Sequence, residues 1–521
     1  MESAVFTPFA NEPYVDFTQS GPREAMRAAL EQVRGALGRT YPLRIGGRSV
    51  ETGRTIRSLN PGKTDETVGL VASAGAAEAE QALAAATDAF ATWSRVPPEV
   101  RAGYLVKAAA ILRRRIYEFA AWMCFEESKP WAEAYADAAE AIDFLEFYAR
   151  QMVRLGGPQP TTPFPGEENE VRYIPLGAGV VIPPWNFPLA ICVGMTSAAI
   201  VCGNTVVLKP ASASPVIAAK FVEAMEEAGL PPGVLNFCPG PGAEVGDRLV
   251  DHPQTRFIAF TGSRDVGLRI FERAARVHPG QRWLKRTVLE MGGKDCIIVD
   301  ETVRDLDAAA EGVVVSAFGF QGQKCSACSR LVAHEKVYDA LLERVVRQAR
   351  EITIGNPASG QDFGMGAVID EGAYRKINDY IAVGRKEGRA ALADLKAPPG
   401  GYYIPPMIFA DVKPTARIAR EEIFGPVLAV MKARGFDEAL AIANDSEYGL
   451  TGALYSADRA RLERARHEFH VGNLYLNRKC TGALVDVQPF GGFNLSGTDS
   501  KAGGRDYLLH FLQGKSICER L

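Results

Sequence analysis

The chain has 521 residues and a formal net charge of -3, with 59 basic side chains against 62 acidic ones. Because a single core stops growing at roughly 250–300 residues, more than one structural unit is expected. The nearly balanced charge excludes a protein that holds nucleic acid through a basic surface.

The N-terminus lacks both the basic-then-apolar pattern of a signal peptide and the Arg-rich bias of a transit peptide, which predicts a cytoplasmic protein. The longest apolar stretch, 189–202, is shorter than the ~20 residues that span a bilayer and is interpreted as a buried helix. The chain contains nine cysteines, an odd number, which does not indicate a disulfide framework in a chain this long. Four of them lie in apolar runs and are interpreted as inert core residues: Cys192, Cys202, Cys238 and Cys296.

Short β-rich runs alternate with amphipathic segments of ~12 to 18 residues between positions 176 and 300. The predicted strands are 177–182, 205–208, 234–237 and 257–260. Such alternation is typical of a parallel sheet covered by helices on both faces, with a nucleotide at the carboxyl ends of the strands.

A second α/β series follows Glu290 and predicts a second domain. Its expected strands are 296–299 and 330–333, and its expected helices are 305–317 and 337–350. The segment 156–172 and the C-terminal tail fit neither series.

Cys325 and Glu290 are the residues that indicate chemistry. A thiolate is a strong nucleophile toward a carbonyl carbon, and a carboxylate that binds no metal can activate the water that hydrolyses a thioester. Asn186 stands between two aromatic residues near two prolines, and on its own it could be a turn residue. Together the three predict covalent catalysis.

Seven short strings carry a resemblance to a known family. In chain order they are PWNFP (184–188), LKP (208–210), FTGS (260–263), LEMGGK (289–294), GQKCSACS (322–329), EIFGP (422–426) and PFGG (489–492). In this order and approximate spacing, they resemble the aldehyde dehydrogenase superfamily. The resemblance covers roughly residue 40 to the C-terminus, and the first ~40 residues add a helical prefix.

The resemblance implies an α/β fold with a Rossmann-like NAD(P)-binding domain and a second α/β catalytic domain. The expected boundaries are 1–153 with 174–290 for the first domain and 291–495 for the second. A small β-flap and tail, 154–173 and 496–521, are expected to form a homo-oligomer, a dimer or larger.

The resemblance also assigns the catalytic roles. Cys325 attacks the aldehyde carbon, and the Asn186 amide and the Cys325 N–H stabilise the oxyanion. Glu290 activates the water that cleaves the resulting thioester.

The expected cofactor contacts follow from the same resemblance. The cofactor-binding positions are Lys209, Ser212, Gly242, Gly246, Gly262, Ser263, Glu422 and Phe424. Gly242 and Gly246 belong to a string with one residue too many for the GxGxxG fingerprint, which is weak evidence, since a plain turn and helix start fits equally well. Ser212 stands where NAD-restricted relatives often carry a glutamate, so NAD is expected and NADP is expected to be tolerated.

Strings around 140–144, 319–327, 477–483 and 488–490 most resemble the L-glutamate γ-semialdehyde dehydrogenases, which complete proline catabolism. The implied substrate contacts are Ser326, Gly482 and Ala483 for the α-carboxylate, Glu140 for the α-ammonium, and Phe187 and Phe490 for the aliphatic chain. The implied partner is a small molecule, with neither nucleic acid nor membrane, and a separate proline dehydrogenase is a candidate partner. Asp486 is an acid where relatives usually have a small residue.

Two alternatives stay open. The same mechanism could serve another semialdehyde or an aliphatic aldehyde. More remotely, Cys325 and Cys328 form a CxxC that could belong to a metal or thiol-redox protein, although no second CxxC supplies the other two zinc ligands and no metal is expected.

Overall fold

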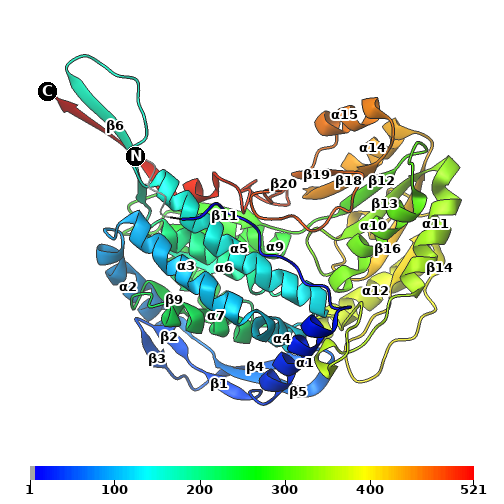
Figure 1. Ribbon diagram of the computed structural model, residues 1–521, viewed down its shortest axis with the longest axis horizontal. Coiled ribbons are helices and arrows are strands. Elements are labelled where there is room, and N and C mark those ends of the chain that lie inside the picture. The colour runs from blue at the N-terminus through cyan, green and yellow to red at the C-terminus, as the bar shows by residue number, and fades with distance from the viewer. Residues whose placement is uncertain (1–5) are drawn as a thin grey trace.

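The computed structural model describes residues 6–521, which form two α/β bodies and a projecting two-stranded ribbon (Figure 1). Each body contains a seven-stranded sheet. The strands of the first sheet, in spatial order, are β11 (Arg286–Glu290), β10 (Phe257–Thr261), β7 (Ala178–Ile182), β8 (Thr205–Leu208), β9 (Leu235–Phe237), β2 (Leu43–Ile45) and β3 (Arg48–Val50). The first five are parallel, and β2 and β3 are antiparallel to their neighbours. The four strands predicted between 176 and 300 are therefore confirmed as β7, β8, β9 and β10.

Helices cover both faces of this sheet because every residue of its central strands is buried and most of them are apolar. Val181 packs into one core, and its neighbours Val180 and Ile182 pack into the other. The first core is covered by α1 (Ser20–Arg34), α3 (Pro98–Arg114), α4 (Ile116–Glu126), α5 (Trp131–Leu155), α6 (Ala190–Val201) and α7 (Pro215–Glu227). The second is covered by α2 (Ala76–Trp93), α8 (Asp247–Asp251) and α9 (Arg264–Ala274).

Two predicted helices lie in this body. The apolar stretch 189–202 is confirmed as the buried helix α6, and α1 lies in the expected N-terminal prefix. None of the helices within residues 6–521 combines the length and the apolar character needed to cross a membrane. A small sheet packs beside them, formed by β1 (Arg39–Tyr41), β4 (Thr55–Asn60) and β5 (Lys63–Ala72).

The second sheet contains the strands β14 (Arg389–Leu392), β15 (Met407–Ala410), β16 (Val427–Ala433), β13 (Cys328–His334), β12 (Asp295–Val299), β18 (Thr451–Tyr455) and β19 (Asn473–Leu476). Only β14 is antiparallel to its neighbour. One face carries α10 (Leu306–Phe318) and α11 (Glu335–Arg350), and the other carries α12 (Glu371–Glu387), α13 (Arg417–Arg420), α14 (Phe436–Asn444) and α15 (Arg459–Glu468). All four elements predicted for the second series are confirmed, and Asp305 caps α10 by accepting from the N–H groups of Asp307 and Ala308.

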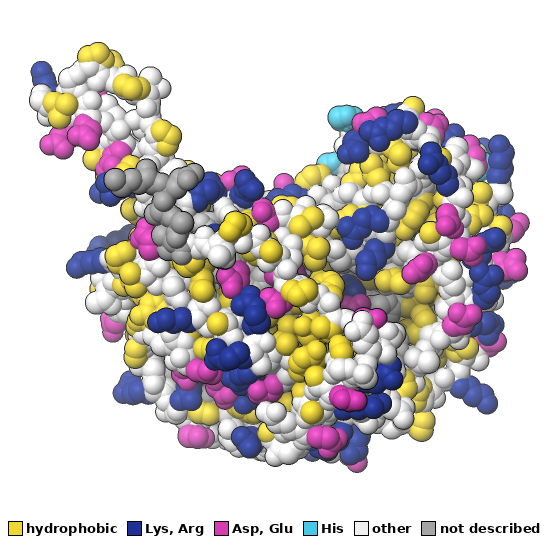
Figure 2. Space-filling model, in the orientation of Figure 1, with side chains coloured by type: hydrophobic (Ala, Val, Ile, Leu, Met, Phe, Trp, Pro, Cys, Tyr) yellow, Lys and Arg dark blue, Asp and Glu magenta, His cyan; other side chains and the backbone are white. Residues whose placement is uncertain are grey.

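The ribbon consists of β6 (Glu167–Pro175) and β21 (Leu512–Arg520), which pair antiparallel along their whole length and extend away from both bodies (Figure 1). The first part of the expected tail, 496–511, does not join the ribbon. It lies beside β11, where Gly497 bridges to Glu290, and it ends in the short helix η4 (Tyr507–Phe511). Basic and acidic side chains are interspersed over the face in Figure 2.

Candidate active site

Cys325 lies on the loop between the 3-10 turn η2 (Gly319–Gly322) and strand β13, at the boundary of two cavities. It is partly exposed, in contrast to Cys328, which is buried in β13. Burial raises the pKa of the Cys325 thiol, and the carboxylates of Asp295 and Glu290 raise it further. The resting group is therefore a thiol, and a base is needed to form the nucleophile.

Asn186 brings an amide to the loop that carries Cys325. It is buried on the loop between β7 and α6, and its Nδ2 donates to the main-chain oxygen of Gln323 at 3.0 Å. This bond uses one of the two N–H groups of the amide, so the other is available to an oxyanion. The predicted pairing of Asn186 with the nucleophile loop therefore has a geometric basis.

Glu290 is the last residue of β11 and is buried. Its Oε1 accepts from the Ser500 hydroxyl at 2.6 Å, whereas its Oε2 has no partner among the described residues. Burial raises the pKa of Glu290 to about 7, although the Ser500 hydrogen bond acts to lower it. A carboxylate with a pKa near neutrality and a free oxygen suits a general base.

The smaller cavity, of about 120 Å³, contains every predicted substrate residue. Its lining includes the six predicted positions Ser326, Gly482, Ala483, Phe187, Phe490 and Glu140, together with Cys325 and Glu290. Gly482 has φ +77°, a left-handed conformation that glycine adopts without strain. The N–H groups of Gly482 and Ala483 donate no hydrogen bond within the described part of the chain, so they are free to bind an anion.

Glu140 has no salt-bridge partner among the described residues, although the charges of Lys129 and Lys324 act to lower its pKa. Burial raises its pKa to about 8, and Asp137 and Asp143 raise it further. An ammonium group in the cavity would supply the missing positive charge and favour the ionised form.

The larger cavity, of about 360 Å³, lies on the other side of Cys325. Gly262, Ser263, Glu422 and Phe424 line it as predicted, and Ser263 precedes the first residue of α9. Free N–H groups at a helix start favour a bound phosphate. Glu422 is held by the Gly293 N–H, which donates to its Oε1 at 3.0 Å.

The other four predicted cofactor residues lie outside that lining. Lys209 is buried at the end of β8, beside Gly246, and within residues 6–521 its Nζ donates a single bond, of 3.3 Å, to the oxygen of Pro210. Burial lowers the pKa of Lys209 to about 8. Ser212 and Gly242 are exposed, and Gly242 begins the π-helical turn Gly242–Gly246, which leads directly into α8.

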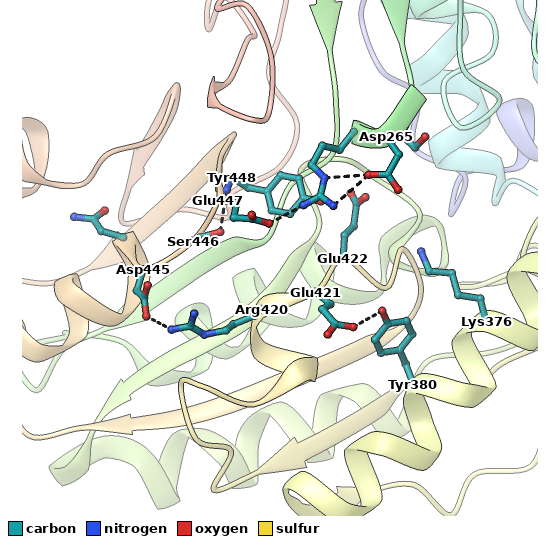
Figure 3. A pocket seen from close by; sticks show the side chains of 13 residues that line it. Asp265, Lys376, Tyr380, Arg420, Glu421, Glu422, Asp445, Ser446, Glu447 and Tyr448 are labelled. Carbon is teal, nitrogen blue, oxygen red and sulfur yellow. Dashed lines mark hydrogen bonds and ion pairs between the residues drawn. The ribbon is translucent and has the colours of Figure 1, made fainter. Parts of the chain in front are cut away.

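A third cavity, of about 880 Å³, adjoins the cofactor cavity and shares Ser263, Lys376 and Glu422 with it (Figure 3). Most of its charged side chains pair with each other: Arg264 with Asp265 and Glu447, and Arg420 with Asp445. The Tyr380 hydroxyl donates to Glu421 at 2.7 Å. The lining of this cavity comes from both bodies.

Two remaining predictions concern Asp486 and Cys328. Asp486 has φ +61°, does not line the substrate cavity, and its carboxylate lies 3.4 Å from Nε of Arg505. The Cys328 thiol donates to the Arg330 oxygen at 3.4 Å inside the core. Within residues 6–521 no group of three or more His, Cys, Asp or Glu side chains could hold a metal ion.

The aldehyde dehydrogenase family model matches residues 48–517. The chain belongs to the aldehyde dehydrogenase family. It is 60% identical over 512 residues, 98% of this chain and 99% of the relative, to the 1-pyrroline-5-carboxylate dehydrogenase of Geobacillus kaustophilus. A structure of 1-pyrroline-5-carboxylate dehydrogenase from Thermus with bound NAD is 54% identical, has a TM-score of 0.97, and is matched over 99% of this chain and 100% of that one. Proline utilization A (PutA) from Bdellovibrio bacteriovorus is 45% identical with a TM-score of 0.96, covering 98% of this chain and 53% of that chain.

These matches confirm the predicted family and the predicted fold class. They also agree with the residues in and near the larger cavity, which fit a dinucleotide on three structural grounds. The start of α9 adjoins the cavity, Glu422 lines the cavity wall, and just outside the lining the buried ammonium of Lys209 has one 3.3 Å hydrogen bond among the described residues.

Several residues of this aldehyde dehydrogenase site were not predicted. Phe144 and Tyr148 follow Glu140 on α5 at intervals of four residues, so all three face the substrate cavity. That spacing is a signal that could have identified them. Ser500 and Tyr507 gave no such signal, because their place beside Glu290 depends on the return of the chain along β11.

Proposed function

We propose that this protein oxidises L-glutamate γ-semialdehyde, in equilibrium with 1-pyrroline-5-carboxylate, to L-glutamate with NAD as the cofactor. The observation that carries the proposal is the position of Cys325 between the 360 Å³ cavity at the start of α9 and the 120 Å³ cavity that contains the predicted substrate residues. The wall of the substrate cavity offers both free amides and an unpaired carboxylate. The Geobacillus and Thermus relatives are 1-pyrroline-5-carboxylate dehydrogenases, which supports the same substrate.

The first chemical task is to form and stabilise a tetrahedral adduct on Cys325. The thiol, whose pKa is raised, transfers its proton to a base from solvent, which leaves Glu290 unprotonated for the later hydrolysis step. The sulfur then attacks the aldehyde carbon. The free N–H of the Asn186 amide and the Cys325 N–H stabilise the negative charge that develops on oxygen.

NAD, when bound, supplies the hydride acceptor. Glu422 and the start of α9 would hold its nicotinamide ribose and a phosphate oxygen, and Lys209 the other ribose. After oxidation the acyl group remains on Cys325 as a thioester. Glu290 then accepts a proton from the water that cleaves this bond, and L-glutamate leaves.

The two charged groups on the α-carbon of the substrate meet opposite chemistry. The α-carboxylate binds the N–H groups of Gly482 and Ala483 and the Ser326 hydroxyl. The α-ammonium pairs with Glu140, whose pKa burial raises to about 8. Phe187 and Phe490 enclose the carbon chain between them.

The assembly of the protein is part of the proposal. The β6–β21 ribbon extends away from both bodies and exposes Ile174, with Phe164 exposed just before β6. An antiparallel pair of strands with free edges binds a second chain readily. We assign it to a homo-oligomer, and a separate proline dehydrogenase stays a candidate supplier of the substrate.

The test follows reduced-cofactor absorbance with L-1-pyrroline-5-carboxylate, succinic semialdehyde and propanal, and with Cys325→Ala as the blank. We expect the pyrroline compound to give the highest kcat/KM by orders of magnitude and the blank to be inactive. A higher kcat/KM for a simple aldehyde would leave the covalent mechanism in place and remove the roles of Gly482, Ala483 and Glu140.

The same assay run with NAD and NADP tests the cofactor prediction. Ser212 is exposed and carries no charge that would repel a 2′-phosphate, so NADP should also support turnover. A penalty for NADP of more than about 4 kcal/mol, roughly 1000-fold in kcat/KM, would contradict this.

A further inference from the structure

Lys129 is a fully buried ammonium that the chemical steps above do not use. It precedes helix α5, and its Nζ lies 2.6 Å from Oδ2 of Asp137. Neither side chain of this pair is exposed to solvent. The same Nζ donates to the main-chain oxygen of Asn186 at 2.8 Å. A buried charge is costly unless it is paired, so this ammonium has a defined position under the Asn186 loop.

Two aromatic rings contact the Lys129 ammonium. Its Nζ lies 4.1 Å from the ring centroid of Phe187 and 4.5 Å from that of Phe320. Phe187 follows Asn186 in the chain, and Phe320 belongs to the turn that leads to Cys325. One ammonium therefore contacts both the loop of the oxyanion donor and the loop of the nucleophile.

The neighbours of Lys129 strengthen the connection. Asp137 accepts from the N–H of Ala190, the first residue of α6, at 2.6 Å. The Ser128 oxygen accepts from Nε2 of Gln321 at 3.2 Å. Phe320 and Gln321 have φ values of 48° and 58°, which are strained for residues with side chains and persist only where surrounding contacts hold them.

We propose that Lys129 is a positioning residue that fixes the main chain of Asn186 against the Cys325 loop, so that the Asn186 amide is already in place when the oxyanion forms. A misplacement of about 1 Å at such a donor can cost on the order of 10²-fold in rate. The inference rests on the covalent mechanism of the proposed function, and it does not depend on which aldehyde is the substrate.

Three variants distinguish the effect of losing the Lys129 ammonium from the effect of a less stable fold. Lys129→Met and Asp137→Asn each leave one buried charge without its partner, so each single variant should unfold at a lower temperature. The double variant removes both charges, and the amide oxygen introduced at position 137 can still accept the Ala190 N–H. We expect its Tm to return toward that of the original protein while its acylation rate stays low.

The acylation rate of Cys325 is measured with p-nitrophenyl acetate, an ester whose reaction needs neither an aldehyde nor the cofactor. The sulfur of Cys325 attacks the ester carbonyl, a C–S bond forms, and the C–O bond breaks as p-nitrophenolate leaves with the electron pair. This step passes through an oxyanion. We expect the double variant to acylate Cys325 roughly 10- to 100-fold more slowly.

Alkylation by iodoacetamide gives the control reaction, because it displaces iodide without forming an oxyanion. Measured by mass on the peptide that contains Cys325, it should change less than about twofold in the double variant. A matched control pair, Asp300→Asn with Arg461→Met, removes an ion pair of 3.1 Å from the second body. This control should leave both reactions unchanged.

A double-mutant cycle with Asn186→Ala tests whether Lys129 affects the acylation rate through Asn186. If Lys129 acts through Asn186, its replacement should cost almost nothing more once the amide is gone. An equal loss in both backgrounds, an alkylation rate that falls as far as the acylation rate, or an acylation rate that Asn186→Ala leaves unchanged would each overturn the proposal. A different preferred aldehyde would overturn the proposed substrate alone.

Discussion

Glu290, the proposed general base, shows how burial can move the ionisation of a carboxyl group toward neutral pH. Its carboxylate has one hydrogen bond, to Ser500, and one oxygen without a partner among the described residues. Its pKa is raised from 4.5 to about 7 mainly by burial. The group therefore changes charge near neutral pH, which is where a base must both accept and release a proton.

Replacing Glu290 by Gln should stop thioester hydrolysis. We expect turnover to fall by roughly 10²- to 10⁴-fold, with an acyl-enzyme that accumulates on Cys325 and is visible by mass spectrometry. In the original protein the rate of hydrolysis should decline as pH falls through about 7, because Glu290 becomes protonated. Full turnover by Glu290→Gln, or no such limb in the pH profile, would assign the base to another residue.

Glu290→Gln should also change the free energy of unfolding, and the gain in stability should grow as pH rises. Because the folded-state pKa is raised, ionising Glu290 costs folding free energy that appears as pH rises from about 4.5 to 7. Glu290→Gln should therefore gain stability relative to the original protein between pH 5 and pH 8, by roughly 3 kcal/mol at most. Urea unfolding at the two pH values measures the difference, and a gain of equal size at both would contradict the ionisation.

At the scale of elements, the loop from β11 to β12 connects the base, the cofactor cavity and the nucleophile. Gly292 and Gly293 pass between the Glu422 carboxylate and the main chain of Cys325 so closely that a Cβ on either would overlap them. The two glycines therefore permit a close approach that no other residue could make at these positions.

Gly292→Ala should displace the Glu422 carboxylate without reaching Cys325. We expect the KM for NAD to rise about tenfold, because one good hydrogen bond to the ribose is worth roughly 1.4 kcal/mol. Acylation by p-nitrophenyl acetate should be unchanged, since it needs no cofactor. An unchanged KM for NAD in steady-state kinetics would remove Glu422 from the cofactor site.

Most elements around the site were predictable from local patterns. The strands β7, β8 and β10 are short apolar runs buried on both faces, so period and composition were enough. The π-helical turn at Gly242 was not predictable, because its geometry depends on Val245 packing against the first body. Residues 496–511 were expected in the tail because they fit neither α/β series and because the family resemblance implied a flap there. It is their hydrogen bonds to β11 that place them beside Glu290.

At the scale of the whole molecule, two covered sheets bring their loops together and a separate ribbon extends from them (Figure 1). The active-site residues come from both bodies: Asn186 and Glu290 from the first, Cys325 and Glu422 from the second. Closing the site therefore requires that the two bodies keep their relative position, which contacts such as those of Lys129 favour.

Deleting β21 from residue 513 onward should lower the number of subunits in the proposed oligomer. The deletion leaves β6 without its partner and leaves both seven-stranded sheets intact, because neither contains β6 or β21. We expect a lower mass by light scattering and acylation of Cys325 by the ester within about twofold of the full chain. An unchanged mass would place the subunit contact elsewhere.

The sequence by itself determined the family, the covered parallel sheets and the reacting groups, because each is encoded in contiguous residues. A strand needs only a few apolar positions, and the strings around Cys325, Glu290 and Asn186 are local. Only the tertiary structure decided which residues support those groups. Ser500 bonds Glu290 across 210 positions, and Lys129 bonds Asn186 across 57. Such contacts depend on how distant segments pack, and no local pattern of charge or hydrophobicity specifies them.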